Sequence, residues 1–268
     1  MSFFKDKVVV VTGGSEGIGK AFVELLIKEG AKVATCGRNY DKLYQLQLNN
    51  STVMLHTEVC DVSKESECKK FIDSTIQVFG KIDILINNAG KSMRALFNEV
   101  DLSVMKNLMD VNFWGAVYCT KYALPSILEN KGSVVSISSI AGYRGLPGRS
   151  GYSASKYALQ GWMEALRTEL LPTGVNVLWI CPGFTASNIR NVALSKDGSP
   201  QGESPMDESK MMSAEECAQI SLNAIAARKR TVVMTGTGKR TVFLNRLWPS
   251  LADKLTYKYF FKNGELVR

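Results

Sequence analysis

Three side chains that can move a proton occur in the middle of the chain. Tyr152 and Lys156 are four residues apart, a spacing that puts both on one face of a helix, and Ser139 precedes the tyrosine by thirteen residues. A free tyrosine has a pKa of about 10, and a neighbouring ammonium group would lower that pKa toward neutrality. The set predicts acid–base catalysis at a carbonyl oxygen, which Ser139 would orient. A Tyr-x-x-x-Lys pair alone can also be purely structural.

A glycine-rich segment near the N-terminus can seat a phosphate group. Gly13, Gly17 and Gly19 follow an apolar run and open a helical pattern. Glycine lets the backbone turn sharply and approach a pyrophosphate, while the helix N-terminus points unpaired N–H groups at the anion. The segment therefore predicts a dinucleotide site, although a plain turn between a strand and a helix would have the same composition.

The end of the second apolar run distinguishes between two nicotinamide cofactors. An acidic residue there would bind the adenosine ribose, but the chain has Arg38, which can hold a 2′-phosphate with a hydrogen bond from Ser15. We therefore expect NADP(H) to be preferred over NAD(H), unless Arg38 is only a solvated surface charge. Asp61 and Val62 follow a third strand-like run and are expected to flank the adenine.

Apolar runs alternate with helical patterns along most of the chain. The runs predict strands at 7–12, 32–36, 52–57, 82–87, 132–138, 175–181 and 231–235. Helical spacing predicts helices at 17–29, 41–48, 63–79 with Ser63 as N-cap, 103–128, 152–171 and 214–227. The strands are continuously apolar, which favours a parallel sheet covered on both faces. We expect an α/β fold with a single doubly wound, Rossmann-type sheet of about seven strands.

Length and composition limit the class of protein. The 268 residues fit one large domain, residues 1–268, and would also allow two. Six cysteines without a Cys-x-x-Cys pair predict reduced, buried thiols, and a single histidine cannot form a histidine metal site alone. No apolar run is long enough to span a membrane, and the N-terminus lacks a signal-peptide pattern. We expect a cytoplasmic protein, peripheral to a membrane at most, without a metal ion.

Two segments depart from the alternating pattern. Residues 188–213 contain a polar stretch with several prolines and glycines, which is typical of a lid over an active site or of a disordered insert, and we expect a lid. Residues 238–268 form a basic, amphipathic C-terminal extension. The range 228–268 holds ten Lys/Arg and two Asp/Glu, so its charge equals the +8 of the whole chain.

The C-terminal extension has two interpretations. Leu244, Leu247, Trp248, Leu251 and Leu255 recur at helical spacing, which makes one face apolar. A basic amphipathic segment can lie on an anionic membrane surface, or its apolar face can cover the substrate pocket of its own subunit. The proline after Trp248 must begin a helix or kink it. We expect no nucleic-acid binding, because no recognition motif accompanies the positive charge.

Together the motifs resemble the classical short-chain dehydrogenase/reductase family over residues 5–236. The matching segments are TGGSEGIG (12–19), NNAG (87–90), SSIAG (138–142), YSASK (152–156) and PG (182–183). The resemblance implies that Asn112 completes the catalytic set of Ser139, Tyr152 and Lys156 by anchoring a water that relays protons through the lysine. It also implies homodimers or homotetramers that pack through the helices around 103–128 and 152–171.

The motifs and the resemblance together predict a set of cofactor contacts. These residues are Gly13, Ser15, Gly17, Ile18, Gly19, Arg38, Asp61, Val62, Asn88, Gly90, Tyr152, Lys156, Pro182, Gly183 and Thr185. Lys156 would grip the nicotinamide ribose, and the segment that begins at Pro182 would present backbone groups to the nicotinamide amide. No metal ligand is expected among them.

These observations predict an NADP(H)-dependent oxidoreductase that reduces a hydrophobic ketone or oxidises the matching secondary alcohol. The region after Gly183 is similar, more weakly, to steroid- and lipid-type reductases. A 3-oxoacyl substrate presented by an acidic carrier protein is an alternative with the same chemistry. A non-catalytic NADP-binding sensor and a peripheral membrane protein are alternatives from other classes. The intact Ser/Tyr/Lys/Asn set disfavours the sensor, because a pure binder needs no proton relay.

Overall fold

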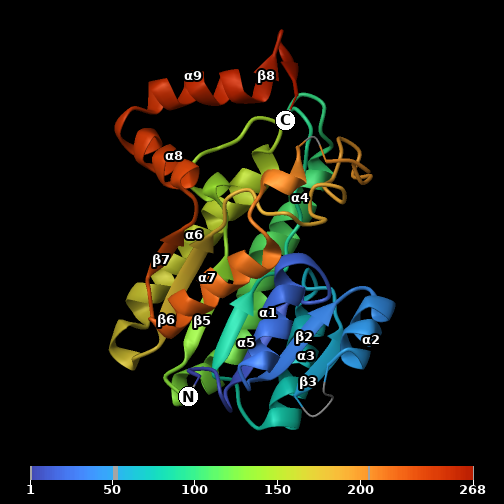
Figure 1. The fold of residues 1–268 in the computed structure, drawn as a ribbon, viewed down its shortest axis with the longest axis vertical. Helices are drawn as coiled ribbons and strands as arrows, with labels where there is room; N and C mark the ends of the chain where they lie inside the picture. Colours follow the sequence, from blue (N-terminus) through green and yellow to red (C-terminus); the bar gives the residue numbers. More distant parts are fainter. Residues whose placement is uncertain (1, 51–53, 205, 268) are drawn as a thin grey trace.

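One seven-stranded parallel sheet organises the protein in a computed structural model that describes residues 2–50, 54–204 and 206–267 (Figure 1). Its strands are β1 (Val8–Thr12), β2 (Lys32–Gly37), β3 (Leu55–Val59), β4 (Ile84–Asn87), β5 (Ser133–Ile137), β6 (Asn176–Cys181) and β7 (Thr231–Val233). The strand order is β3-β2-β1-β4-β5-β6-β7, so the connections run outward in opposite directions from the centre. This confirms the doubly wound, Rossmann-type fold.

Helices connect the strands and cover the sheet on both faces. The α-helices are α1 (Gly17–Lys28), α2 (Tyr40–Leu48), α3 (Glu65–Phe79), α4 (Leu102–Met109), α5 (Gly115–Glu129), α6 (Ser150–Glu169), α7 (Ala214–Ala226), α8 (Gly236–Leu247) and α9 (Pro249–Phe260). Short helical turns are η1 (Asp110–Trp114, a π-helical turn), η2 (Ile140–Gly142), η3 (Leu171–Thr173) and η4 (Glu208–Lys210). A two-stranded hairpin, β8 (Phe261–Lys262) with β9 (Glu265–Leu266), follows α9.

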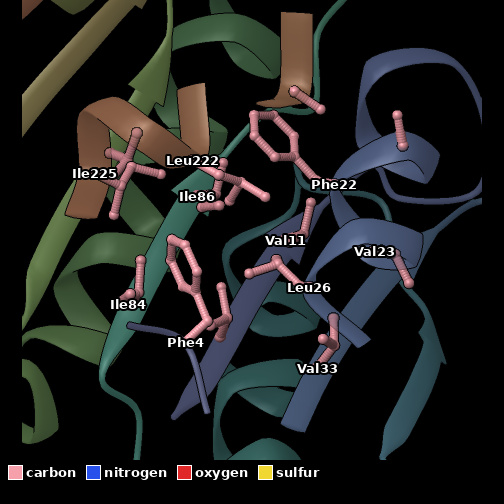
Figure 2. Packing of buried hydrophobic residues seen from close by; sticks show 14 of the residues in the cluster. Phe4, Val11, Phe22, Val23, Leu26, Val33, Ile84, Ile86, Leu222 and Ile225 are labelled. Atoms are coloured by element: carbon pink, nitrogen blue, oxygen red, sulfur yellow. The ribbon is translucent and has the colours of Figure 1, made fainter. Parts of the chain in front are cut away.

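The face of the sheet under α1 and α7 forms one hydrophobic core. Phe22 and Leu26 of α1 meet Leu222 and Ile225 of α7 above the apolar side chains of the sheet, among them Ile86 (Figure 2). All five side chains are buried. Because strands of this sheet are covered on both sides, their sequences are apolar without alternation.

The opposite face of the sheet packs under α3, α5 and α6. Phe71 and Ile72 of α3, Ile127 of α5 and Leu159 of α6 belong to this second core, together with Leu85 of β4. These side chains are at most 1% exposed, so both faces of the sheet are closed to water.

The reversal of strand order leaves a crevice beyond the carboxyl ends of β1 and β4, where open α/β sheets bind ligands. Hydrogen bonds of Thr12 and Asn88 connect the two loops that border this crevice. The Thr12 hydroxyl accepts hydrogen bonds from the backbone N–H groups of Asn88 and Ala89, both at 3.0 Å. In return, the Asn88 amide donates to the carbonyl oxygens of Thr12 at 2.9 Å and Gly13 at 3.2 Å.

The helix predicted over 103–128 contains a π-helical turn that the sequence pattern does not indicate. The helix runs as α4, the turn η1 and α5. The turn adds a residue to the local helical repeat and carries Asn112. Both of its flanking helices have regular apolar spacing, which is why a single uninterrupted helix was expected.

Two further predicted boundaries differ from the structure. Helix α3 begins at Glu65 after Lys64, and Ser63 is not its N-cap, because the Ser63 hydroxyl donates to the Asp61 carboxylate at 2.7 Å instead. The strand predicted at 52–57 is observed as Leu55–Val59, and residues 52–53 lie outside the described residues. The other predicted strands and helices occur, most of them with ends shifted by one or two residues.

The C-terminal extension forms two helices, and the proline after Trp248 begins the second of them, one of the two outcomes that the sequence allowed. The backbone breaks at Trp248 (φ −135°, ψ 69°), and Pro249 is the first residue of α9. Helices α8 and α9 project beyond the layers of the sheet and its covering helices (Figure 1). They are attached through Arg144, which hydrogen-bonds Asn245 at 3.0 Å and pairs with Asp253 at 2.6 Å. The apolar residues of the extension are therefore divided between two helices.

The segment 188–213 has little regular structure but is held by specific contacts. Arg190 donates to the Thr185 carbonyl at 2.8 Å and pairs with Glu208 at 2.9 Å. Leu194 forms isolated β-bridges with Met93 and with a later residue of its own segment. The segment thus folds back over the loop that follows β4.

Two predictions about composition can be compared with the described residues. All six cysteines are free and buried, as expected for small apolar packing groups. Within the described part of the chain, no helix has both the length and the apolar character needed to cross a membrane.

The buried core predicts a large cost for removing one ring. Phe22 is fully buried between α1 and the sheet, so we expect Phe22→Ala to lower the free energy of unfolding by about 3–5 kcal/mol. Phe97, which is 66% exposed, serves as the control, and Phe97→Ala should change the free energy of unfolding by no more than about 0.5 kcal/mol. Chemical denaturation of both variants measures the difference. Equal losses would show that this core is not packed as described.

Candidate active site

A cavity of about 510 Å³ lies at the carboxyl ends of the central strands. Of the residues predicted from the sequence, those that line it are Gly13, Ser15, Gly17, Ile18, Gly19, Arg38, Asp61, Val62, Asn88, Gly90, Ser139, Tyr152, Lys156, Pro182, Gly183 and Thr185. They come from segments spread over most of the sheet, which shows that one crevice brings the two motif groups together. Asn112 is the one predicted site residue outside this lining.

The glycine turn after β1 is shaped by close backbone contacts. Gly13 and Gly17 have positive φ angles of 70° and 56°, which other residues adopt only with strain. A Cβ atom at Gly19 would lie 2.1 Å from the carbonyl oxygen of Gly13, so only glycine fits where α1 begins. The turn therefore brings the N-terminus of α1 against the cavity, where its first N–H groups have no partner within the helix.

Arg38 and Asp61 mark the end of the cavity beyond β2 and β3. Arg38 is exposed, and none of the described residues forms a hydrogen bond or ion pair with its guanidinium. Burial would raise the pKa of Asp61, but hydrogen bonds from Ser63 and the charges of Arg38 and Lys91 outweigh it and lower the pKa. Asp61 therefore stays ionised, and its Oδ1 accepts from the Ser63 hydroxyl at 2.7 Å and the Ser63 N–H at 3.0 Å.

Tyr152, Lys156 and Ser139 come together at the centre of the cavity. Tyr152 and Lys156 are one turn apart on α6, and Ser139 follows the end of β5. The Tyr152 phenol and the Ser139 hydroxyl are hydrogen-bonded. The Lys156 ammonium donates to the Ile137 carbonyl at 2.8 Å and lies 5.8 Å from the centroid of the Tyr152 ring. The bond to Ile137 fixes the lysine between the sheet and the tyrosine.

The electrostatics of Tyr152 differ from the sequence expectation. Burial raises the pKa of the phenol above its usual value, and the hydrogen bond with Ser139 and the charge of Arg149 only partly oppose this. Lys156 was expected to lower this pKa, and that expectation is wrong for this structure. Burial instead lowers the pKa of Lys156 itself to about 8, so the lysine remains largely protonated at neutral pH.

Asn112 is held beside the catalytic set by the π-helical turn. Its side-chain oxygen accepts from the Lys91 N–H at 2.8 Å, and its amide donates to the Lys91 carbonyl and the Ser155 hydroxyl, both at 2.9 Å. A Cβ atom at Gly90 would lie 3.2 Å from Asn112 Oδ1 and 3.7 Å from Lys156 Nζ. The Asn112 side-chain oxygen and the Lys156 ammonium therefore both lie against Gly90, and the water relay between them stays a prediction.

The loop after β6 forms the opposite wall. A Cβ atom at Gly183 would lie 2.6 Å from the Thr235 side chain, so the loop lies tightly on the start of α8. Thr185 is buried, and its hydroxyl donates to the Gly183 carbonyl at 3.3 Å. Pro182, Gly183, Phe184 and Thr185 thereby line the cavity, and their backbone contact with a nicotinamide amide stays a prediction.

Sequence reasoning missed four basic residues that line the cavity, and two of them, Lys91 and Arg149, lie next to recognised motifs; the other two are Lys42 and Arg190. Lys91 directly follows the NNAG segment, and its ammonium donates to Asn107 at 2.9 Å. Arg149 lies three residues before Tyr152 and is only 9% exposed. Their adjacency to recognised motifs was the available signal, but a Lys or Arg beside a motif is ordinarily solvated, and only the fold shows that these two turn inward.

Comparisons with known proteins agree with this arrangement. A family model described as "short chain dehydrogenase" matches residues 7–198. Dehydrogenase/reductase SDR family member 7B of Xenopus laevis is 34% identical over 260 residues, covering 93% of this chain and 80% of that protein. The 11-beta-hydroxysteroid dehydrogenase-like 2 protein of Arabidopsis thaliana is 40% identical over 189 residues, covering 68% and 60%.

Solved structures share the fold. A short chain dehydrogenase/reductase from Burkholderia phymatum in complex with NAD has a TM-score of 0.83 at 24% identity, covering 94% of this chain and 96% of that one. A short-chain dehydrogenase from Streptomyces avermitilis has a TM-score of 0.81 at 25% identity, covering 95% and 97%. Because the family model and the relatives extend over the sheet, the glycine turn and the Ser/Tyr/Lys set, the chain belongs to the short-chain dehydrogenase/reductase family and is an oxidoreductase.

Proposed function

We propose that the protein is an NADP(H)-dependent reductase of hydrophobic ketones, or dehydrogenase of the matching secondary alcohols, with Tyr152 as the general acid and base. The observation that carries the proposal is the common cavity, lined by the glycine turn and by Ser139, Tyr152 and Lys156. A dinucleotide seated on the turn would extend toward the tyrosine. The two halves of the cavity then serve one reaction.

The residues of the cavity fit a nicotinamide dinucleotide. The turn at Gly13 and Gly19 has no room for side chains and provides close backbone approach to a pyrophosphate. Lys156 would hold the nicotinamide ribose, and the backbone after Pro182 would meet the nicotinamide amide. When bound, this cofactor supplies a hydride to the carbonyl carbon or accepts one from the alcohol carbon.

The protein's part in the reaction is the transfer of one proton. In the reducing direction, the Tyr152 phenol gives its proton to the carbonyl oxygen as the hydride arrives at carbon, which yields the neutral alcohol. In the oxidising direction, the phenolate takes the proton of the alcohol. Ser139 would orient the substrate oxygen, and Lys156, with Asn112 behind it, would return the proton through water.

Cofactor preference rests on Arg38. It lies at the end of β2, where the fold binds the adenosine ribose, and its guanidinium has no partner among the described residues. A 2′-phosphate would be a partner for the Arg38 guanidinium, and Ser15 also lines this part of the cavity. We therefore keep NADP(H) over NAD(H) as part of the proposal. The relative from Burkholderia phymatum contains NAD.

The substrate side of the cavity is partly apolar. Leu146, Phe184, Val192 and Met206 line it, which suits a hydrophobic carbonyl compound. Segment 188–213, which contributes several of these residues, is proposed to act as a lid. A 3-oxoacyl compound remains the alternative substrate class, because the same proton and hydride transfers would serve it.

Assembly is proposed to be a homodimer or homotetramer. An aromatic group on η1, α5 and α6 supports this: Phe113 contacts Trp114 and Trp162, and Trp114, which is 43% exposed, stacks on Tyr118. Large aromatic side chains at a surface are typical of protein interfaces. These are the helices through which the family resemblance implies subunit contact.

We further propose that the protein is cytoplasmic and that its C-terminal extension contacts a membrane surface peripherally. Phe243, Leu247, Trp248, Leu251 and Leu255 on α8 and α9 are each 44–58% exposed, and Phe243 and Trp248 are in ring contact. Basic residues occur between and beside them in the sequence: Lys239, Arg240, Arg246, Lys254 and Lys258. Exposed leucine and aromatic side chains among basic residues fit an anionic lipid surface. Self-association through this surface is disfavoured, because each extension carries most of the +8 charge of the chain and two copies would repel each other.

Removing the phenolic hydroxyl tests the proposed mechanism. Tyr152→Phe leaves the ring but no proton to transfer, so we expect turnover of ketones and alcohols to fall by at least a thousandfold, about the effect of losing a general acid together with its hydrogen bond to substrate. NADPH binding, measured by fluorescence titration, should remain within about threefold of the wild type, well under the tenfold that 1.4 kcal/mol represents. Unchanged turnover in this variant would contradict the assignment.

Changing Arg38 tests the cofactor preference. Arg38→Ala removes a charge-assisted contact of about 1.5–3 kcal/mol with a 2′-phosphate, so the Kd for NADPH should rise about ten- to a hundredfold. The Kd for NADH, which lacks that phosphate, should change little. Arg38→Lys keeps the charge without the guanidinium fork and should fall between the two. Equal weakening of both cofactors would mean that Arg38 is not the discriminating residue.

Vesicle binding tests the membrane contact. Each basic residue at an anionic surface is worth about 1 kcal/mol, so reversing two charges in Lys254→Glu/Lys258→Glu should weaken binding to phosphatidylserine vesicles at least about thirtyfold. Trp248→Ser/Leu251→Ser should weaken it further. Leu102→Ser changes a leucine that is 74% exposed on α4 and is the control. Equal sedimentation of all forms, or none with any vesicle, would count against the proposal.

A further inference from the structure

A second cavity, of about 540 Å³, lies between the start of α6 and the C-terminal extension. Its lining residues come from the loop 144–147 and the first turn of α6 on one side, and from α9 on the other. The volume is within the range of about 300–1,000 Å³ that is typical of small-molecule sites. Leu146 also lines the catalytic cavity, so the two cavities share one wall residue.

Buried polar groups without a partner are concentrated at this second cavity. In the part of the chain that the structure describes, four buried side-chain nitrogen or oxygen atoms have no hydrogen-bond partner. Two of them, Arg144 Nε and Ser150 Oγ, belong to residues that line this cavity, whereas the others belong to Asn87 of β4 and Asn176 of β6. Buried polar groups are ordinarily hydrogen-bonded, because leaving one without a partner is destabilising. Two such groups in one cavity are the pattern expected where a ligand completes the site.

The other nitrogens of Arg144 fix the direction of its guanidinium. One terminal nitrogen donates to the Asn245 side chain at 3.0 Å, and the other pairs with Asp253 at 2.6 Å. The Arg144 side chain is only 15% exposed, so it cannot turn Nε to open water without breaking these contacts. A guanidinium has donors and no acceptor, so the partner of Nε must be an acceptor atom. The Ser150 hydroxyl can either donate to the same ligand or accept from it.

Charge and surface chemistry limit the class of ligand. Because Arg144 already pairs with Asp253, an anion would have to compete with that carboxylate, whereas an uncharged oxygen can use Nε beside the existing pair. Leu146 and Pro147 give the cavity an apolar wall, and the ring of Tyr257 also lines it. A few directed polar groups in an otherwise apolar lining are characteristic of sites for small organic molecules.

We propose that the cavity between α6 and α9 is a ligand site, separate from the catalytic cavity, for an apolar molecule that carries an uncharged carbonyl or hydroxyl oxygen. The oxygen accepts from Arg144 Nε–H and shares a hydrogen bond with the Ser150 hydroxyl, while the apolar body lies against Leu146 and Pro147. The bound molecule contacts the core of the protein and α9 together, so its binding holds the C-terminal extension in place. The proposal does not depend on the reaction proposed for Tyr152.

Hydrogen exchange followed by mass spectrometry locates the binding. The probe is methyl hexyl ketone, added to the full-length protein without a nicotinamide cofactor, so that no turnover occurs. Exchange in residues 249–260 should slow as the ketone concentration rises, because the bound molecule opposes the opening of α9. Thr256→Trp places a large ring in the cavity and should abolish this protection. Protection confined to the loop after β6 would mean binding in the catalytic cavity alone and would overturn the proposal.

Removal of one hydroxyl separates a ligand group from a structural one. The Ser150 hydroxyl has no partner in the protein, so Ser150→Ala should leave the free energy of unfolding unchanged or raise it. The same change should raise the Kd for the ketone, obtained from the protection of residues 249–260, by about three- to tenfold. Thr168→Ala is the control, because Thr168 is exposed on the same helix and lies outside both cavity linings. An unchanged Kd in Ser150→Ala, or a loss of stability, would contradict the assignment.

A comparison of two probes tests the class of ligand. Octanoate has as many carbon atoms as methyl hexyl ketone but is charged at neutral pH, and it should protect residues 249–260 more weakly than the ketone. Tighter binding of octanoate would show that Asp253 is displaced and that the site takes anions, which refutes the proposed class. No protection of α9 by either probe would mean a hydrated groove only. Since turnover enters none of these measurements, the inference stands or fails separately from the proposed function.

Discussion

The hydrogen bonds between Thr12 and Asn88 are the constraint on which the site depends. They join the carboxyl ends of β1 and β4, the two central strands from which the chain departs in opposite directions. The pairing of β1 with β4 extends to Val11 and Ile86, and this tie continues the connection into the glycine turn and the NNAG segment. Because both partners are short polar side chains that bond to backbone, the connection is rigid and leaves the crevice between the loops open.

The fold and the main site residues could be predicted because their signals are local. A continuous apolar run, a glycine turn that opens a helix and a Tyr-x-x-x-Lys spacing each lie within a few residues of sequence, and their order along the chain determines where a doubly wound sheet brings them. Tyr152 and Gly13 are far apart in sequence, but Gly13 follows β1 and Tyr152 lies on α6, the helix that follows β5. The cavity joins them for that reason.

The features that were missed depend on competition between groups that residue spacing does not reveal. Asp61 binds the Ser63 hydroxyl that could have capped α3, and Arg149 lies under the ring of Phe260, which is far away in sequence. The direction of the Tyr152 pKa also belongs here, because burial, which spacing cannot reveal, outweighs the nearby positive charge. Each of these is an electrostatic or steric competition that the chain resolves only after folding.

The π-helical turn at η1 has a consequence for the helix that contains it. One additional residue in a helix changes the phase of everything after it by about 100°. Val104 and Leu108 before the turn pack with Met93 and the loop after β4, whereas Cys119 and Ile127 after it pack under the sheet. The apolar faces of α4 and α5 therefore pack against two different surfaces. The change of face occurs at the turn that carries Asn112, the residue that contacts Lys91 and Ser155.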